Sequence, residues 1–124
     1  MTRLFVYGTL KRGGENHLHL AGQRFLGEAA TGPGFTLYGL KGFPGMVRTT
    51  DASEGVTGEL WEIDADRLRR LDQFEGTAEG IYARAPITLL APFADLPVET
   101  YFYLRSVEGR PQLGSTWVVQ RRSL

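Results

Sequence analysis

The sequence predicts a β-rich α+β domain of about six strands and one main helix. Its apolar runs are short, rich in β-branched and aromatic residues, and separated by turn-forming residues that include many of the 16 glycines. Only one stretch, residues 64–76, carries both the start and the stop signals of a longer helix. The 124 residues are expected to form a single domain, residues 1–124. A chain of this length can bury about two thirds of its unfolded surface.

The strands are expected where apolar residues run between turn-forming residues without helical spacing. Residues 56–63, VTGELWEI, place apolar side chains on both faces, so this strand is expected to be partly buried on both sides. Residues 91–97 contain two prolines and are expected to connect the last two strands. In chain order, the six expected strands are residues 4–7, 35–38, 46–49, 56–63, 82–90 and 98–104.

The main helix is expected between two residues that favour helix ends. Asp64 can accept hydrogen bonds from the free amides of the first turn, and Gly76 can take the left-handed conformation that ends a helix. Asp66 lies where the helix dipole favours negative charge and one turn before Arg70, with which it can pair. A second, shorter helix is expected over residues 16–20.

Composition excludes several classes of protein. Lys and Arg number 14, as do Asp and Glu, so the charge balance does not predict a partner among nucleic acids or anionic membranes. There is no cysteine, which excludes disulfides and cysteine-bound zinc and fits a reducing compartment. The two histidines, His17 and His19, would point to different sides of a helix, so no metal site is expected. No apolar run approaches the roughly 20 residues that span a bilayer, and we expect a cytoplasmic protein.

One acidic residue falls on the apolar face of the main helix. At about 100° per residue, Glu75 lies between Leu68 and Leu71 on the helical wheel. Burial of a carboxyl group raises its pKa unless a partner compensates. Glu75 could swing out past Gly76 and form a salt bridge, or it could point into a cavity as a general acid or base. Asp72, at the edge of the same apolar arc, is a rival for the second role.

The first strand runs directly into a glycine-rich turn, in the stretch LFVYGTLKRGG of residues 4–14. A strand that ends in glycine can expose consecutive amide groups, which form a concave site for phosphate or carboxylate. The spacing of Gly8 and Gly13 matches a P-loop, but the lysine and hydroxyl residue of that motif are absent. A tight connection that needs Gly8 only for its backbone angles is the alternative.

Five motifs follow one another along the chain. They are VYGTLKRG at residues 6–13 followed by Asn16 and His17, GELW at residues 58–61, LDQFEG at residues 71–76, Tyr82 with Arg84, and Tyr101 with Tyr103. Together, in this order and spacing, they resemble the gamma-glutamylcyclotransferase-like superfamily. The closest branch is similar to the gamma-glutamylamine cyclotransferases and their small bacterial relatives, and the resemblance covers roughly residues 4–103.

The resemblance implies a compact mixed β-barrel with a cavity at one end. It also implies a reaction without a cofactor, in which a gamma-glutamyl amine or related compound is cyclised to 5-oxoproline and an amine is released. Glu75 is implied as the catalytic acid/base. The backbone amides of the turn would hold the glutamyl group, and two tyrosines are candidates for the cavity wall, although both could be ordinary core residues. The substrate-binding residues are therefore expected to be Tyr7, Gly8, Thr9, Leu10, Tyr82 and Tyr103.

Two segments follow the family pattern only loosely: residues 42–46, which align with a family loop that helps wall the site, and the segment after Arg105. The identity of the leaving amine is therefore left open, as is the oligomeric state. A non-catalytic module that binds a small molecule in the same cavity is the alternative function. A passive site for a carboxylate would, however, gain nothing from the buried negative charge of Glu75.

Overall fold

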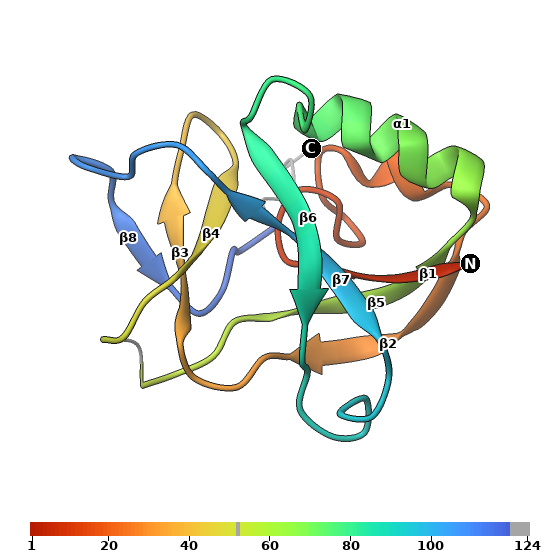
Figure 1. The fold of residues 1–124 in the computed structure, drawn as a ribbon, viewed down its shortest axis with the longest axis horizontal. Helices are drawn as coiled ribbons and strands as arrows, with labels where there is room; N and C mark the ends of the chain where they lie inside the picture. The colour runs from red at the N-terminus through yellow and green to blue at the C-terminus, as the bar shows by residue number, and fades with distance from the viewer. Residues whose placement is uncertain (52, 120–124) are drawn as a thin grey trace, which may run out of the picture.

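The computed structural model describes residues 1–51 and 53–119 (Figure 1). Within these residues, eight strands form a five-stranded sheet of order β2-β5-β1-β7-β6 and a three-stranded sheet of order β4-β3-β8. One α-helix and one 3₁₀ helix complete the fold. The elements are β1 (Thr2–Val6), η1 (His17–Leu20), β2 (Arg24–Ala30), β3 (Phe35–Gly39), β4 (Pro44–Arg48), β5 (Thr57–Ile63), α1 (Ala65–Glu75), β6 (Tyr82–Ile87), β7 (Val98–Tyr103) and β8 (Gln112–Gly114).

Strand β1 lies at the centre of the larger sheet and is buried on both faces. Leu4 and Val6 belong to the apolar cluster that includes the buried residues of α1, whereas Phe5 and Tyr7 belong to the cluster shared with β3 and β4. Successive side chains of a strand point to opposite faces, so this single run contributes to both clusters. Double burial explains why the run is continuously apolar rather than alternating. Figure 1 shows α1 and the smaller sheet in different parts of the molecule.

The register of the larger sheet determines which residues meet at the end of β1. This strand runs antiparallel to β5, with Val6 opposite Glu59, and parallel to β7, with Phe5 opposite Thr100. The antiparallel pair of β6 and β7 places Tyr82 opposite Tyr103. The turn after β1, the start of β6 and the end of β7 therefore come together at one edge of the sheet.

The main helix begins and ends as predicted. The Asp64 side chain accepts a hydrogen bond of 2.7 Å from the Arg67 amide, and Gly76 adopts a left-handed conformation with φ of 70°. The pair between Asp66 and Arg70 forms at 3.5 Å, on the exposed side of the helix. The shorter helix expected over residues 16–20 is the 3₁₀ helix η1.

The α+β class with one main helix is confirmed, with three differences in the strands. The sheets remain open rather than closing into a barrel, and two strands, β2 and β8, were not predicted. In β2 the register shifts between Phe25 and Gly27, and this bulge breaks the alternation by which a strand is recognised. Strand β8 has only three residues. The strand expected over residues 82–90 ends earlier, at Ile87.

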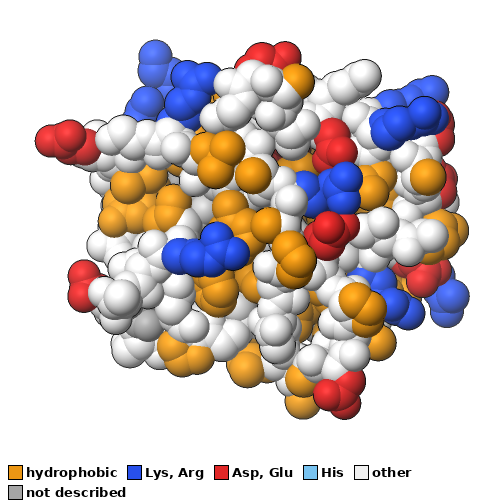
Figure 2. Space-filling view, in the orientation of Figure 1, with side chains coloured by type: hydrophobic (Ala, Val, Ile, Leu, Met, Phe, Trp, Pro, Cys, Tyr) orange, Lys and Arg blue, Asp and Glu red, His pale blue; other side chains and the backbone are white. Residues whose placement is uncertain are grey.

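The surface mixes charges of both signs. Figure 2 shows acidic and basic side chains interspersed over the visible face, as the equal numbers of acidic and basic residues suggest. No helix among the described residues is long and apolar enough to cross a membrane.

Candidate active site

A cavity of about 280 Å³ lies at the edge of the sheet where β1 ends. Its wall combines the turn that follows β1, the last turn of α1, the beginning of β6 and the loop before β4. These segments are far apart in the sequence, and the strand register brings them together. The lining residues are Phe5, Val6, Tyr7, Gly8, Thr9, Leu10, Asn16, Phe43, Pro44, Phe74, Glu75, Ile81, Tyr82 and Tyr101.

The turn after β1 is held by its carbonyl groups, which leaves amide groups available. The Gly8 carbonyl accepts from the Lys11 amide at 3.1 Å, and the Thr9 carbonyl accepts from the Asn16 amide at 3.0 Å. The Asn16 side chain also donates to the Thr9 hydroxyl at 3.0 Å. Across the described residues, the amides of Gly8, Thr9 and Leu10 donate none of the turn and loop hydrogen bonds. A set of free amides beside a cavity can bind an anionic group.

Glycine is required at position 8 because another chain segment comes very close. A Cβ atom on Gly8 would lie 2.6 Å from the Cγ atom of Pro44, which is part of a rigid ring. Gly8 does not have a positive φ angle, so the alternative that it is needed for its backbone angles is wrong. The missing side chain instead allows the Pro44 wall to approach the turn.

The carboxyl group of Glu75 lies in the cavity wall at the last residue of α1. The side chain is half-buried, and none of the ion pairs among the described residues involves it. Burial raises the pKa of Glu75 from its ordinary value of 4.5 to about 7. Of the two orientations that the sequence allows, the structure therefore has the one that faces the cavity. A carboxyl group with this pKa can both accept and donate a proton near neutral pH.

The rival carboxylate, Asp72, is committed to other partners. Arg84 donates to its two oxygens at 2.9 and 3.0 Å, and the Tyr101 hydroxyl donates to it at 2.7 Å. Burial alone would raise the pKa of Asp72, but the hydrogen bonds from Arg84 and Tyr101 outweigh burial and lower it. Two carboxyl groups one turn apart on α1 are thus shifted in opposite directions, a pattern that separates a proton-transferring acid from a structural one.

Of the three tyrosines predicted to bind substrate or line the cavity, two lie in its wall and one does not. The Tyr7 hydroxyl donates to the Tyr101 carbonyl at 2.6 Å and accepts from the Met46 amide at 3.2 Å. The Tyr82 hydroxyl donates to the Pro44 carbonyl at 2.8 Å. Burial, followed by nearby acidic groups that include Glu75, raises the pKa of both, so both stay neutral. Tyr103 is absent from the cavity wall in the described part of the chain and packs edge-on against Tyr82, with ring centroids 5.4 Å apart.

Several wall residues were not predicted. Asn16 and Tyr101 stand within the family motifs, but their spacing alone does not indicate a site. Phe43 and Pro44 belong to residues 42–46, the loosely matching segment that the resemblance assigns to the wall of the site, and both line the cavity. The Met46 amide donates to the Tyr7 hydroxyl at 3.2 Å and Pro44 packs against Gly8, and no local signal in the sequence indicates these long-range contacts.

The comparison with known families agrees with this arrangement. A family model described as gamma-glutamyl cyclotransferase, AIG2-like, matches residues 4–119, which contain every residue of the cavity wall. The chain belongs to this family. The match extends through the three-stranded sheet and therefore covers the whole of the described fold apart from the first residues of β1.

Individual members of the gamma-glutamyl cyclotransferase, AIG2-like family are similar in sequence and in structure. The gamma-glutamylaminecyclotransferase of Rattus norvegicus is 39% identical over 83 residues, which cover 61% of this chain and 56% of the rat protein. The gamma-L-glutamyl-butirosin B gamma-glutamyl cyclotransferase of Niallia circulans is 33% identical over 75 residues, covering 60% of this chain and 46% of that protein. The matched part thus spans about half the length of these two relatives.

A solved structure matches over a longer range. The crystal structure of an AIG2-like protein from Mus musculus superimposes with a TM-score of 0.77 at 26% identity. The superposition covers 100% of this chain and 98% of the mouse chain. The open pair of sheets is therefore the fold of this family, although the comparison does not assign a role to any side chain.

The raised pKa of Glu75 predicts how stability depends on pH. The folded protein holds the Glu75 proton more tightly than the unfolded chain does. Protonation of Glu75 therefore contributes to the free energy of unfolding, fully below pH 4.5, and this contribution is lost as the pH rises through about 7. Each pKa unit corresponds to about 1.4 kcal/mol, so the full effect is on the order of 3 kcal/mol. Urea denaturation at pH 4 and at pH 8 gives the free energy of unfolding of Glu75→Gln and of the parent. The difference between them should shift in favour of the variant by about 3 kcal/mol from pH 4 to pH 8, because only the parent loses the contribution of the proton. A difference that does not change with pH would contradict the burial of this carboxyl group.

Proposed function

We propose that this protein releases 5-oxoproline from a gamma-glutamyl amine or a related gamma-glutamyl compound, with Glu75 as the general acid and base. One observation carries the proposal: a carboxyl group that titrates near pH 7 shares a cavity of about 280 Å³ with a turn whose amides are free. The names of the rat and Niallia circulans relatives support the same class of reaction. The absence of cysteine suits a cytoplasmic enzyme of this kind.

The reaction is an intramolecular aminolysis. The α-amino nitrogen of the glutamyl group attacks its own γ-carbonyl carbon, which forms the bond that closes a five-membered lactam. The bond from that carbon to the leaving nitrogen then breaks. The Glu75 carboxylate takes a proton from the attacking nitrogen and returns it to the leaving nitrogen, so no water, oxidant or reductant is consumed. A pKa of about 7 places the acid and base forms of Glu75 at similar populations near neutral pH.

The turn after β1 supplies the binding energy and the geometry in this proposal. The amides of Gly8, Thr9 and Leu10 receive the negative charge of the substrate and of the oxygen that develops at the γ-carbon. Holding the flexible glutamyl chain in a folded conformation can lower the barrier by up to roughly 7–11 kcal/mol. Tyr82 forms part of the cavity wall, and the Tyr103 ring packs edge-on against it.

The size of the cavity favours a small substrate. Sites for drug-sized ligands have volumes of about 300–1,000 Å³, so the present cavity suits an amino-acid derivative rather than a nucleotide. Glu75 also argues against the alternative of a non-catalytic binding module, because a half-buried carboxyl group that has no ion pair with another described residue weakens the binding of an anion. The substrate we propose is therefore a small gamma-glutamyl compound, and no nucleic acid or membrane partner is proposed.

Replacing the proposed acid/base tests this mechanism. Glu75→Gln keeps the shape of the side chain but removes proton transfer, so kcat for 5-oxoproline release should fall by about 10²–10⁴-fold. Glu79→Gln is the matched control, because Glu79 is exposed beyond the end of α1 and should keep the parent rate. The assay is 5-oxoproline release from a panel of gamma-glutamyl amines. A Glu75→Gln variant with the parent rate would refute the assignment, and tight binding of the panel without turnover by the parent would favour the binding module.

A second substitution tests the turn. Gly8→Ala places a methyl group against the Pro44 ring, so the turn or the wall must move, and a displacement of about 1 Å can cost a hundredfold in rate. We expect kcat/KM to fall by about this factor. Gly32→Ala is the control, because its nearest neighbour would be 3.8 Å from the new Cβ atom. Similar kcat/KM values for the two variants would show that the turn does not shape the site.

A further inference from the structure

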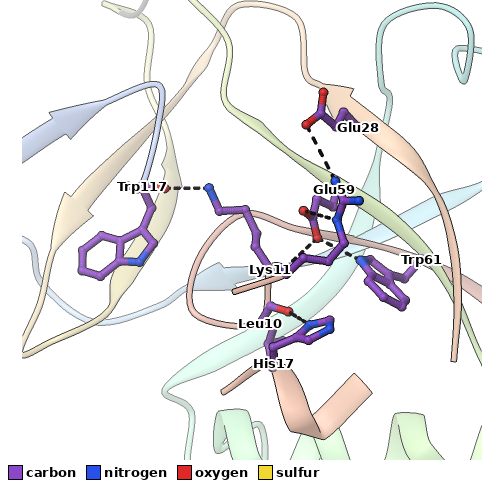
Figure 3. Close-up of polar contacts among 8 residues, drawn as sticks. Leu10, Lys11, His17, Glu28, Glu59, Trp61 and Trp117 are labelled. Carbon is purple, nitrogen blue, oxygen red and sulfur yellow. Dashed lines mark hydrogen bonds and ion pairs between the residues drawn. The ribbon is translucent and has the colours of Figure 1, made fainter. Parts of the chain in front are cut away.

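Glu59, on β5, is an acidic residue that the proposed chemistry does not use. Its exposed fraction is only 7%. Figure 3 shows the carboxylate in the midst of polar contacts with the loop that follows the turn. One oxygen accepts from the Arg12 amide at 3.0 Å and from the Trp61 indole at 3.1 Å. The other accepts from the Arg12 guanidinium at 3.0 Å.

The position of Glu59 links the two ends of the turn. In the sheet it lies opposite Val6, the last residue of β1, from which the chain enters the turn. Its partner Arg12 lies two residues beyond Leu10, where the chain leaves the turn. One carboxylate therefore ties the exit of the turn to the strand beside its entry.

Two further contacts hold the exit of the turn (Figure 3). The Leu10 carbonyl is 2.9 Å from the Nδ1 atom of His17, and because a carbonyl can only accept, Nδ1 carries the proton. The Lys11 ammonium donates to the Trp117 carbonyl at 2.6 Å. Residues 10–12 are thus each bound to a different segment, and of these three contacts the one between Arg12 and Glu59 involves the most deeply buried charged group, the Glu59 carboxylate.

A stabilising role alone does not explain a carboxylate at this position. Glu59 lies directly opposite Glu28 of β2, and like charges that face each other across a sheet are destabilising. Arg12 compensates both, at 3.0 Å from Glu59 and 3.8 Å from Glu28. The Arg12 side chain is half exposed, but the Glu59 carboxylate is buried, and a buried charge seldom adds net stability compared with an apolar residue. The best-attested use of such a charge is to specify one arrangement. The arrangement specified here is the path of the chain beyond Leu10.

We propose that Glu59 is a positioning residue, which holds the amides of Gly8, Thr9 and Leu10 in place through Arg12 and so sets the affinity for the glutamyl group. Glu59 is not among the residues that line the cavity in the described structure, and it acts without touching the substrate. This inference rests on the proposed function for its effect on catalysis. Its effect on the turn itself is independent of that function.

The test compares two glutamates that contact the same arginine. Glu59→Gln keeps an oxygen acceptor but turns an NH₂ group toward the Arg12 guanidinium, whereas Glu28→Gln alters a contact that is exposed and longer. For Glu59→Gln we expect KM to rise about tenfold, with a much smaller change in kcat and the parent pH profile, because Glu75 is not altered. Hydrogen exchange measured by NMR should become about tenfold faster at the hydrogen-bonded amides that hold the turn, those of Lys11 and Asn16, but not in β1 or β5. Glu28→Gln should match the parent in both measurements.

Each result decides the proposal. Parent values of both KM and turn exchange in Glu59→Gln would overturn it, as would faster exchange spread evenly over the sheet, which indicates general destabilisation. If the parent releases no 5-oxoproline, the proposed function fails, but exchange at the turn still decides the role of Glu59. If Glu59→Gln does not fold, Arg12→Ala serves in its place, because Arg12 is half exposed and its amide contact remains. A rise of about threefold in KM, together with faster hydrogen exchange confined to the turn, would then support the proposal. Parent values of both KM and the exchange rate would overturn it.

Discussion

The arrangement of the site depends on the burial of Glu75 at the end of α1, where it takes part in none of the ion pairs found among the described residues. Desolvation is the cause of its raised pKa, and that pKa gives one side chain both an acid and a base form near neutral pH. Arg84 is bound to Asp72, one turn before Glu75 on α1, and to Glu99. This arginine is committed to two other carboxylates, and burial alone accounts for the raised pKa of Glu75.

The fold provides this environment through the ends of its strands. Strand β1 runs between β5 and β7 and stops at Val6, so the turn that follows emerges beside β5 and opposite the end of α1. The same edge contains the start of β6, where Tyr82 contacts the Pro44 carbonyl and closes the cavity from the smaller sheet. Glu59 and Pro44 approach the turn from different sheets, one by hydrogen bonds and the other by close packing. The shape of the turn is thus determined by its neighbours as well as by its own sequence.

Local signals in the sequence predicted the elements whose causes are local. Asp64 and Gly76 determine the ends of α1 by capping, and the helical period placed Glu75 on the buried face. The edge strands β2 and β8 escaped prediction because a bulge and a length of three residues hide their alternation. The reason for Gly8 and the role of Glu59 were also hidden, since both depend on residues more than 30 positions away. Tyr103, expected in the wall, packs against the ring of Tyr82 and is not among the described residues that line the cavity, a detail of packing that strand alternation does not resolve.

The most direct measurement is a crystal structure of the protein with 5-oxoproline, the proposed product. The proposed mechanism predicts that the lactam lies in the cavity with an oxygen within hydrogen-bond distance of the amides of Gly8, Thr9 or Leu10. The Glu75 carboxyl group then faces the ring nitrogen, which is the atom whose proton it is proposed to move. A ring bound elsewhere, or a Glu75 side chain turned away from it toward solvent, would contradict the central claim.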